Sequence, residues 1–159
     1  MQFALTVPTV ADRVAQMVVK LAIEPHDDFF RPHTVVPVLK RLPHPSLGIV
    51  WDIANTYVVG DDPATGFGLL GKRLHYVHVK DVVGMWPNRT LKLVGEGDVP
   101  LQAAFNLLMA GGYTGAFSYE WEKAWYPELP PAEVAFPVAL RAIRALIAGT
   151  NAWPVEALR

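Results

Sequence analysis

The sequence contains no cysteine among its 159 residues. This excludes disulfides and thiolate metal sites, and it fits the reducing cytoplasm in which we expect the protein to act. Charge is also scarce, since Lys, Arg, Asp and Glu make up 18% of the residues and the formal net charge is -1. Such a composition argues against binding to nucleic acid or to an acidic membrane surface.

Long apolar runs are lacking as well. No stretch approaches the roughly 18 consecutive apolar residues of a membrane span. The first eight residues also lack the basic region of a signal peptide. What is present is an apolar chain, 52% hydrophobic, with 14 prolines. This length and composition predict one soluble domain over residues 1–159.

The hydrophobic pattern alternates between the two types of secondary structure. Short apolar runs predict four strands at residues 21–24, 47–52, 74–81 and 115–120. Helical spacing predicts helices at residues 9–20, 33–42, 65–74, 98–110 and 131–148, with Thr9 as a possible N-cap and residues 84–98 as a long loop. Because strands alternate with helices, we expect an α/β fold with a parallel sheet.

A polar residue with metal-binding chemistry lies at the end of each predicted strand. These residues are Glu24, Asp52, His78 and Glu120. The carboxyl ends of parallel strands meet at one edge of a sheet, so the four side chains should converge. Three carboxylates in one place repel one another unless a cation neutralises them. Oxygen and nitrogen ligands without sulfur suit a divalent metal such as Mn²⁺, Mg²⁺, Co²⁺ or Zn²⁺.

Such a site predicts proton-transfer chemistry on a small sugar. A metal that chelates a carbonyl and its neighbouring hydroxyl acidifies the C–H bond between them and stabilises an enediolate. Two carboxylates on opposite faces of that carbon can act as base and acid. Glu24 and Glu120, on the outer two of the four strands, are placed for these roles.

Five short motifs carry a resemblance to a known family. They are Leu21-Ala-Ile-Glu24-Pro-His26, Trp51-Asp52-Ile-Ala-Asn55, Val77-His78-Val-Lys80-Asp81, Gly95-Glu96-Gly97-Asp98 and Ser118-Tyr-Glu120-Trp-Glu122. Together they resemble the xylose-isomerase-like sugar phosphate isomerase/epimerase family of TIM barrels. The resemblance covers nearly the whole chain and corresponds to strands five to eight of that barrel, about half of it.

The resemblance implies specific roles for the residues that match. In the family, Glu, Asp, His and Glu at these strand ends hold a divalent metal, which implies Glu24, Asp52, His78 and Glu120 here. The two family glutamates also transfer the proton. The implied function is a metal-dependent isomerase or epimerase of small sugars or sugar phosphates.

The sequence departs from the family pattern at two places. Many members have a substrate-binding His three residues after the aspartate, where this chain has Asn55. Epimerases of the family often carry an Arg a few residues beyond the His-x-Lys-Asp motif, and residues 82–85 contain none. The resemblance therefore supports metal binding by this chain more strongly than it supports any particular sugar substrate.

Several residues keep more than one interpretation. Asn55, Lys80 and His26 are the candidate substrate-binding residues, and His26 also lies two residues from Glu24. Lys80 can neutralise an enediolate or a phosphate, or form a solvated pair with Asp81. Glu122 competes with Glu120 as the last ligand, because strand alternation puts both on the same side.

A glycine pattern and three tryptophans are also compatible with other functions. Gly66, Gly68 and Gly71 fit the dinucleotide-binding G-x-G-x-x-G spacing, but they lie inside a predicted helix with no strand directly before it. Trp51, Trp121 and Trp125 can stack on a sugar, although packing in the core is the commoner role of tryptophan.

A sheet of four strands also predicts an assembly. Half of an eight-stranded barrel has two unpaired edges, here the strands around Ile23 and Phe117, and we expect Ile23, Val50, Val77 and Phe117 to form an apolar inner face. A homodimer or a missing N-terminal half would close the barrel. The alternative function is therefore a truncated, inactive half-barrel that needs a partner half.

Overall fold

The structure is a computed structural model that describes residues 2–29 and 31–149. Four parallel strands form its main sheet in the order β1-β2-β3-β6. They are β1 (Leu21–Ile23), β2 (Leu47–Asp52), β3 (Leu74–Val79) and β6 (Ala116–Tyr119). The predicted α/β class and parallel sheet are confirmed. The predicted single domain also includes residues 1, 30 and 150–159, which lie outside the described part.

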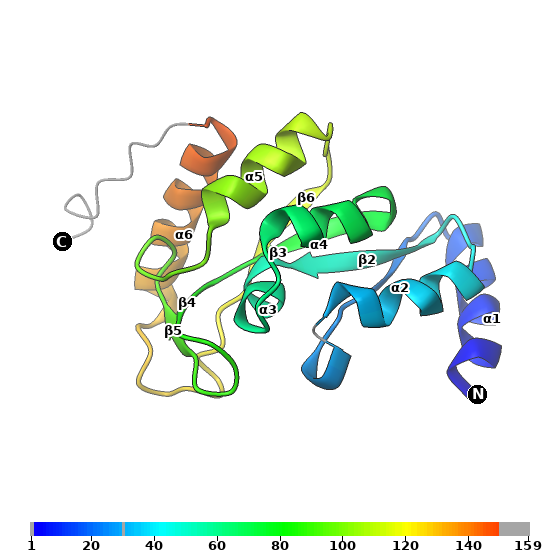
Figure 1. The fold of residues 1–159 in the computed structure, drawn as a ribbon, viewed down its shortest axis with the longest axis horizontal. Helices are drawn as coiled ribbons and strands as arrows, with labels where there is room; N and C mark the ends of the chain where they lie inside the picture. The colour runs from blue at the N-terminus through cyan, green and yellow to red at the C-terminus, as the bar shows by residue number, and fades with distance from the viewer. Residues whose placement is uncertain (1, 30, 150–159) are drawn as a thin grey trace.

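Helices precede, separate and follow these strands along the chain. They are α1 (Gln2–Gln16), α2 (Pro32–Arg41), α3 (Ile53–Val58), α4 (Pro63–Leu70), α5 (Leu101–Ala110) and α6 (Ala132–Ile147), with short 3-10 turns at Asp27–Phe29 and Gly71–Arg73. Figure 1 shows α1 and α6 at opposite ends of the molecule, with α2, α4 and α5 between them. None of the helices in residues 2–29 and 31–149 is long and apolar enough to cross a membrane.

Local sequence signals set most helix ends, and three predictions need correction. Asp62 caps α4 by accepting the Thr65 N–H at 2.7 Å, as its place before Pro63 predicts. Thr9 lies inside α1 and is not its N-cap, and α1 ends at Gln16 instead of residue 20. The helix predicted to run to residue 74 ends at Leu70, because Leu74 already pairs with β2.

Two elements were not predicted. The short helix α3 follows β2 directly, and the Asp52 carboxylate caps it. Strands β4 (Asp81–Val83) and β5 (Thr90–Lys92) form an antiparallel hairpin where the sequence predicts the end of a strand and a loop. Gly84, with a φ of +83°, allows the chain to leave β4 in a conformation that other residues rarely adopt.

The two faces of the main sheet have different surroundings. Trp51, Val77 and Phe117 lie side by side on one face. Helices cover this face, since Phe117 stacks on Phe105 of α5 with ring centroids 4.7 Å apart and Trp51 lies 6.2 Å from Phe67 of α4.

The predicted apolar inner face is therefore wrong for three of its four members. Ile23 pairs with Ile49 in the core, and Val77 and Phe117 lie on the helix-covered face. Side chains alternate along a strand, so Ile23 and Val77, one position before Glu24 and His78, and Phe117, three positions before Glu120, must point away from the site. The opposite face carries Val50 and, in register with it, Tyr76 and Ala116.

Candidate metal centre and active site

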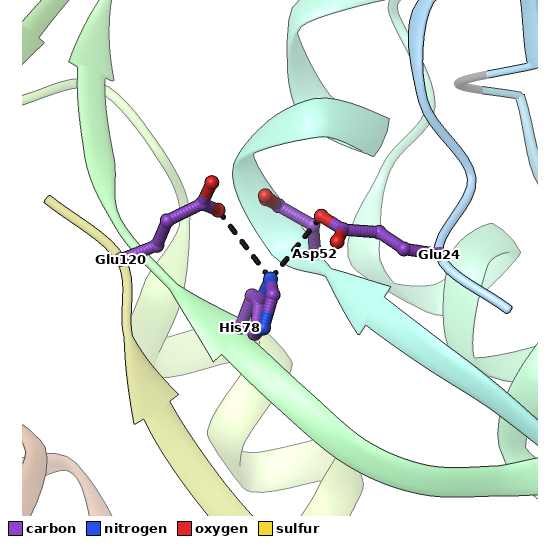
Figure 2. Close-up of side chains that lie close together, drawn as sticks. All are labelled: Glu24, Asp52, His78 and Glu120. Carbon is purple, nitrogen blue, oxygen red and sulfur yellow. Dashed lines mark hydrogen bonds and ion pairs between the residues drawn. The ribbon is translucent and has the colours of Figure 1, made fainter. Parts of the chain in front are cut away.

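Four predicted ligands converge at the carboxyl end of the sheet. Glu24 follows β1, Asp52 ends β2, His78 lies near the end of β3 and Glu120 follows β6. One ligand atom from each residue can be chosen so that all four lie within 4.8 Å of one another. Figure 2 shows Glu24 and Glu120 approaching His78 from opposite sides, with Asp52 between them. The parallel register produces this convergence, because Asp52 and His78 are direct neighbours across β2 and β3.

His78 is the centre of the group. Its Nδ1 lies 3.1 Å from Glu24 Oε1 and 3.4 Å from Glu120 Oε2. Burial lowers the pKa of the imidazole, but the hydrogen bonds and charges of the two glutamates outweigh burial and raise the pKa to about 9. Burial raises the pKa of Glu120, but the hydrogen bond from His78 and the charge and hydrogen bond of Lys80 outweigh it and hold this pKa well below its usual range. The site therefore attracts positive charge strongly.

Asp52 is fixed at both carboxylate oxygens. Its Oδ1 accepts the backbone N–H of Asn55 at 2.9 Å, and its Oδ2 lies 2.9 Å from Lys80 Nζ. Complete burial raises the pKa of Asp52 to about 6, although Lys80 and the Asn55 N–H lower it. The carboxylate position is thus set by a helix start on one side and by an ammonium group on the other.

Lys80 is buried, with 1% of its side chain exposed, and it contacts three carboxylates. Its Nζ lies 2.9 Å from Asp52 Oδ2, 3.0 Å from Glu120 Oε2 and 2.9 Å from Glu122 Oε1. Burial lowers its pKa, but the negative charges around it outweigh that effect and keep the pKa above its ordinary value. The interpretation as a solvated pair with Asp81 is therefore wrong.

Asp81 holds a loop instead. Its carboxylate accepts backbone N–H groups from Val82 at 3.0 Å, Gly95 at 2.8 Å, Gly97 at 3.0 Å and Val99 at 3.2 Å. A Cβ on Gly97 would collide with this carboxylate. The Gly95-Glu96-Gly97-Asp98 motif is thus a segment whose backbone wraps around one buried charge.

The structure places Glu120 and Glu122 in different surroundings. Glu120 belongs to the four-residue group around His78. Glu122 contacts Lys80 and lies 3.9 Å from Arg89 Nη2. Both carboxylates lie near the same ammonium group, but of these two glutamates Glu120 is the one that forms an ion pair with His78, at 3.4 Å. This geometry favours Glu120 as the fourth ligand.

The other predicted substrate-binding residues lie close to the group without joining it. Asn55 is 1% exposed, and within the described residues its side-chain Oδ1 and Nδ2 have no hydrogen-bond partner. His26 is half exposed and contacts Asp27 at 3.1 Å. It also lines a largely apolar cavity of about 470 Å³ together with Glu24 and Phe29. Substrate binding by Asn55 and His26 stays a prediction.

Arg89 is a residue that the sequence reasoning missed. The β4–β5 hairpin returns the chain toward the site and brings the Arg89 guanidinium near Glu122 and 5.0 Å from the centre of the Trp86 ring. The run Thr90-Leu91-Lys92 is too short for its pattern to predict a strand, so the sequence carries no clear signal for this hairpin. Arg89 places a guanidinium beside Glu122, although residues 82–85 contain no arginine.

The glycine and tryptophan patterns have structural explanations. Gly66 and Gly68 lie in α4, and a Cβ on Gly66 would lie 3.1 Å from Trp51 Nε1, so the glycine permits close packing on a buried ring. Trp51 is completely buried and Trp121 donates to the Pro130 carbonyl at 2.9 Å, whereas Trp125 is 80% exposed.

The donor set fits a divalent metal. Three carboxylates and one imidazole meet in a partly buried position, and their ligand atoms are close enough to share one ion. The mixture of oxygen with one nitrogen suits Mn²⁺, Co²⁺ or Zn²⁺, and Mg²⁺ less well. To bind a metal, His78 must give up the proton that its two glutamates hold in place.

A parallel β/α sheet with its polar cluster at the carboxyl ends of the strands is the arrangement found in TIM barrels. The sequence model described as "Xylose isomerase-like TIM barrel" matches residues 3–146. The chain belongs to this family, and the family resemblance of the five motifs is confirmed. No curated protein sequence matches the chain.

Solved structures share the fold at low sequence identity. The IolI protein with a bound zinc atom has a TM-score of 0.75 and 18% identity, over 94% of this chain and 56% of its own. D-psicose 3-epimerase from Clostridium cellulolyticum H10 has a TM-score of 0.73 and 18% identity, over 91% and 55%. The probable 3-DHS dehydratase AsbF from Bacillus anthracis has a TM-score of 0.74 and 17% identity, over 89% and 55%. This chain thus spans about half the length of these proteins.

Proposed function

We propose that this chain carries the catalytic metal site of a divalent-metal-dependent isomerase or epimerase that acts on small sugars or sugar phosphates. The observation that carries the proposal is the convergence of Glu24, Asp52, His78 and Glu120 on one point. Structures with the same fold include a protein with bound zinc and a D-psicose 3-epimerase, which supports both the metal and the reaction class.

The proposed reaction is proton transfer next to a carbonyl group. A divalent metal in the site supplies the positive charge that acidifies the C–H bond beside the carbonyl. Glu24 and Glu120 stand on opposite sides of His78, so a substrate between them has one carboxylate near each face. One carboxylate removes the proton, and the other, in its acid form, returns a proton to the opposite face or to the neighbouring carbon.

Other residues of the chain shape the site. Asp52 holds its carboxylate still through the N–H of Asn55 and the ammonium of Lys80. Asn55, with its unpaired amide, and His26, beside the cavity next to Glu24, are the proposed substrate contacts. The small-molecule substrate would lie over the carboxyl end of the sheet, where the two glutamates are about 30% exposed.

A second candidate function is an inactive half-barrel that acts only with a partner half. Within the described residues, β1 pairs only with β2 and β6 pairs only with β3, so each has an edge with no strand beside it. The matches cover only 56% of the IolI protein and 55% of the D-psicose 3-epimerase. A second copy of the chain, or another half-barrel, would supply the remaining strands.

Calorimetry with Mn²⁺ tests the metal site without requiring activity. We expect the wild-type chain to bind Mn²⁺ and His78→Ala to bind it at least about tenfold more weakly, because even outer partners of metal ligands cost 10–100-fold when removed. His33→Ala is the matched control, since His33 is exposed on α2 and outside the group. Equal affinity of His78→Ala and wild type would refute the proposed site.

A further inference from the structure

We infer that Lys80 is a positioning residue that fixes Asp52 and Glu120 in the arrangement needed for metal binding. This inference rests on the proposed metal site and goes beyond it, because substrate contact is the role that the sequence predicts for Lys80. The structure assigns its ammonium group to protein carboxylates instead.

The Lys80 ammonium group is enclosed by carboxylates. Its Nζ donates hydrogen bonds to Glu120 Oε2 at 3.0 Å and to Glu122 Oε1 at 2.9 Å, and it forms an ion pair with Asp52 Oδ2 at 2.9 Å. Its side chain is only 1% exposed. A lysine buried among three carboxylates has no access to a substrate.

The three partners of Lys80 come from two different strand ends. Asp52 ends β2, whereas Glu120 and Glu122 follow β6, and Lys80 itself follows β3 between them. The ammonium group therefore links the carboxyl ends of strands that flank β3 on both sides. Two of the three partners are proposed metal ligands, and His78 is the ligand on the intervening strand.

Lys80 also restrains the orientation of two proposed ligands. Its Nζ lies 2.9 Å from Asp52 Oδ2, while the Asn55 N–H donates to Oδ1, so both oxygens of this carboxylate have a fixed partner. Its Nζ also lies 3.0 Å from Glu120 Oε2, the same oxygen that lies 3.4 Å from His78 Nδ1. Outer partners of this kind orient ligands and typically change metal affinity by 10–100-fold when they are lost. Without Lys80, the two carboxylates would repel each other and move apart.

Titration with Co²⁺ alone tests this role, because the visible absorption of bound Co²⁺ reports the ligand geometry. We expect Lys80→Met to weaken Co²⁺ binding by about 10–100-fold and to change the absorption bands. If Lys80 acted only as a repelling cation near the metal, its removal would tighten binding. Tighter or unchanged binding with the wild-type spectrum would therefore overturn the inference.

A second variant covers the case in which Lys80→Met does not fold. Lys80→Arg keeps the charge, but a planar guanidinium cannot place one nitrogen among three carboxylate oxygens as an ammonium does. We expect Lys80→Arg to fold and to show altered Co²⁺ bands. A wild-type spectrum and affinity in this variant would show that charge alone matters, which contradicts positioning.

Asp81→Asn is the control for loss of a buried charge. Asp81 is next to Lys80 in sequence, but its carboxylate contacts backbone N–H groups of residues 82–99 and no member of the metal group. It should lower stability and leave the Co²⁺ spectrum unchanged. If wild-type protein binds Co²⁺ and the Lys80 variants match it, only the positioning role fails. If wild-type protein binds no Co²⁺, the proposed metal site fails and the role of Lys80 with it.

Discussion

At the scale of single residues, two carboxylates two positions apart have different surroundings. Glu120 lies 3.4 Å from His78 Nδ1, whereas Glu122 contacts Lys80 and approaches Arg89. Both contact the Lys80 ammonium group, so the difference comes from their second partners. The second partner of Glu120 is His78, and the β4–β5 hairpin brings Arg89 to Glu122.

This difference predicts separate effects of two conservative variants. In any preparation that is active, Glu120→Gln should abolish exchange of the substrate α-proton with solvent, because Gln keeps the shape and removes the base. Glu122→Gln should retain most of the exchange. The measurement is proton NMR of the substrate in D₂O, and a dead Glu122→Gln variant with an active Glu120→Gln variant would reverse the assignment.

Asp81 predicts a large effect on stability. Its carboxylate accepts four backbone N–H groups, and Asn would place a donor against at least one of them. We expect Asp81→Asn to reduce the free energy of unfolding by roughly 3 kcal/mol, since hydrogen bonds to charged groups are worth more than neutral ones. Urea denaturation followed by circular dichroism measures this change.

Asp98→Asn is the matched control for Asp81. Asp98 also accepts a backbone N–H, from Gly84 at 3.3 Å, but as a single contact at the surface. Its substitution should change the free energy of unfolding by less than about 1 kcal/mol. Similar losses in both variants would show that the number of N–H contacts and their burial do not decide the effect.

At the scale of elements, α5 supports the strand that carries Glu120. Phe105 of α5 is fully buried, and its ring stacks on Phe117 of β6. We expect Phe105→Ala to lower the free energy of unfolding by about 3–5 kcal/mol, because it leaves a large cavity. Met109→Ala, on the exposed side of the same helix, should stay within about 0.5 kcal/mol. Thermal and urea unfolding of both variants would test this, and equal losses would contradict the packing.

The hairpin β4–β5 shows how an element acts on the site from outside the main sheet. Asp81 begins β4 and ties down residues 95–99, while Arg89, just before β5, reaches Glu122. A short run such as Thr90-Leu91-Lys92 fits a strand or a loop equally well in the sequence. Only its pairing with β4 decides between them, and that pairing brings Arg89 to the site.

At the scale of the whole molecule, the sheet has two edges without a neighbouring strand in the described residues, those of β1 and β6. Apolar side chains are exposed near both of them, including Met17 at 66%, Val18 at 94%, Phe136 at 54% and Leu140 at 51%. Unpaired edges and exposed apolar residues both favour association. A dimer with twofold symmetry could place eight strands in one closed barrel.

We therefore expect the isolated chain to form a homodimer or to aggregate. Size-exclusion chromatography with light scattering over a dilution series measures its mass. Ala116→Lys places a charge on an exposed position of β6 and should reduce association, whereas Ala103→Lys, on an exposed position of α5, should not. A stable monomer at all concentrations, with cooperative unfolding, would show that the half-barrel stands alone.

Local chemistry and periodicity in the sequence were sufficient to predict the parallel sheet, its four strands and the convergence of Glu24, Asp52, His78 and Glu120. Each of these features depends on residues close together in the chain, or on the rule that parallel strands end at one edge of a sheet. The alternation of side chains between the two faces of a strand is also a local property. Val77 and Phe117 lie an odd number of positions before His78 and Glu120, so alternation alone places them on the face opposite the ligands, which is the face that helices cover.

Only the tertiary structure decided between residues with the same local pattern. The sequence leaves Lys80 either a substrate contact or a solvated partner of Asp81, but Asp52 and Glu122, 28 residues before it and 42 residues after it, enclose its ammonium group. The choice between Glu120 and Glu122 likewise depends on His78 and Arg89, which no local spacing relates to them. Buried charges take their partners from wherever the fold places opposite charge, and that placement is a property of the packed chain.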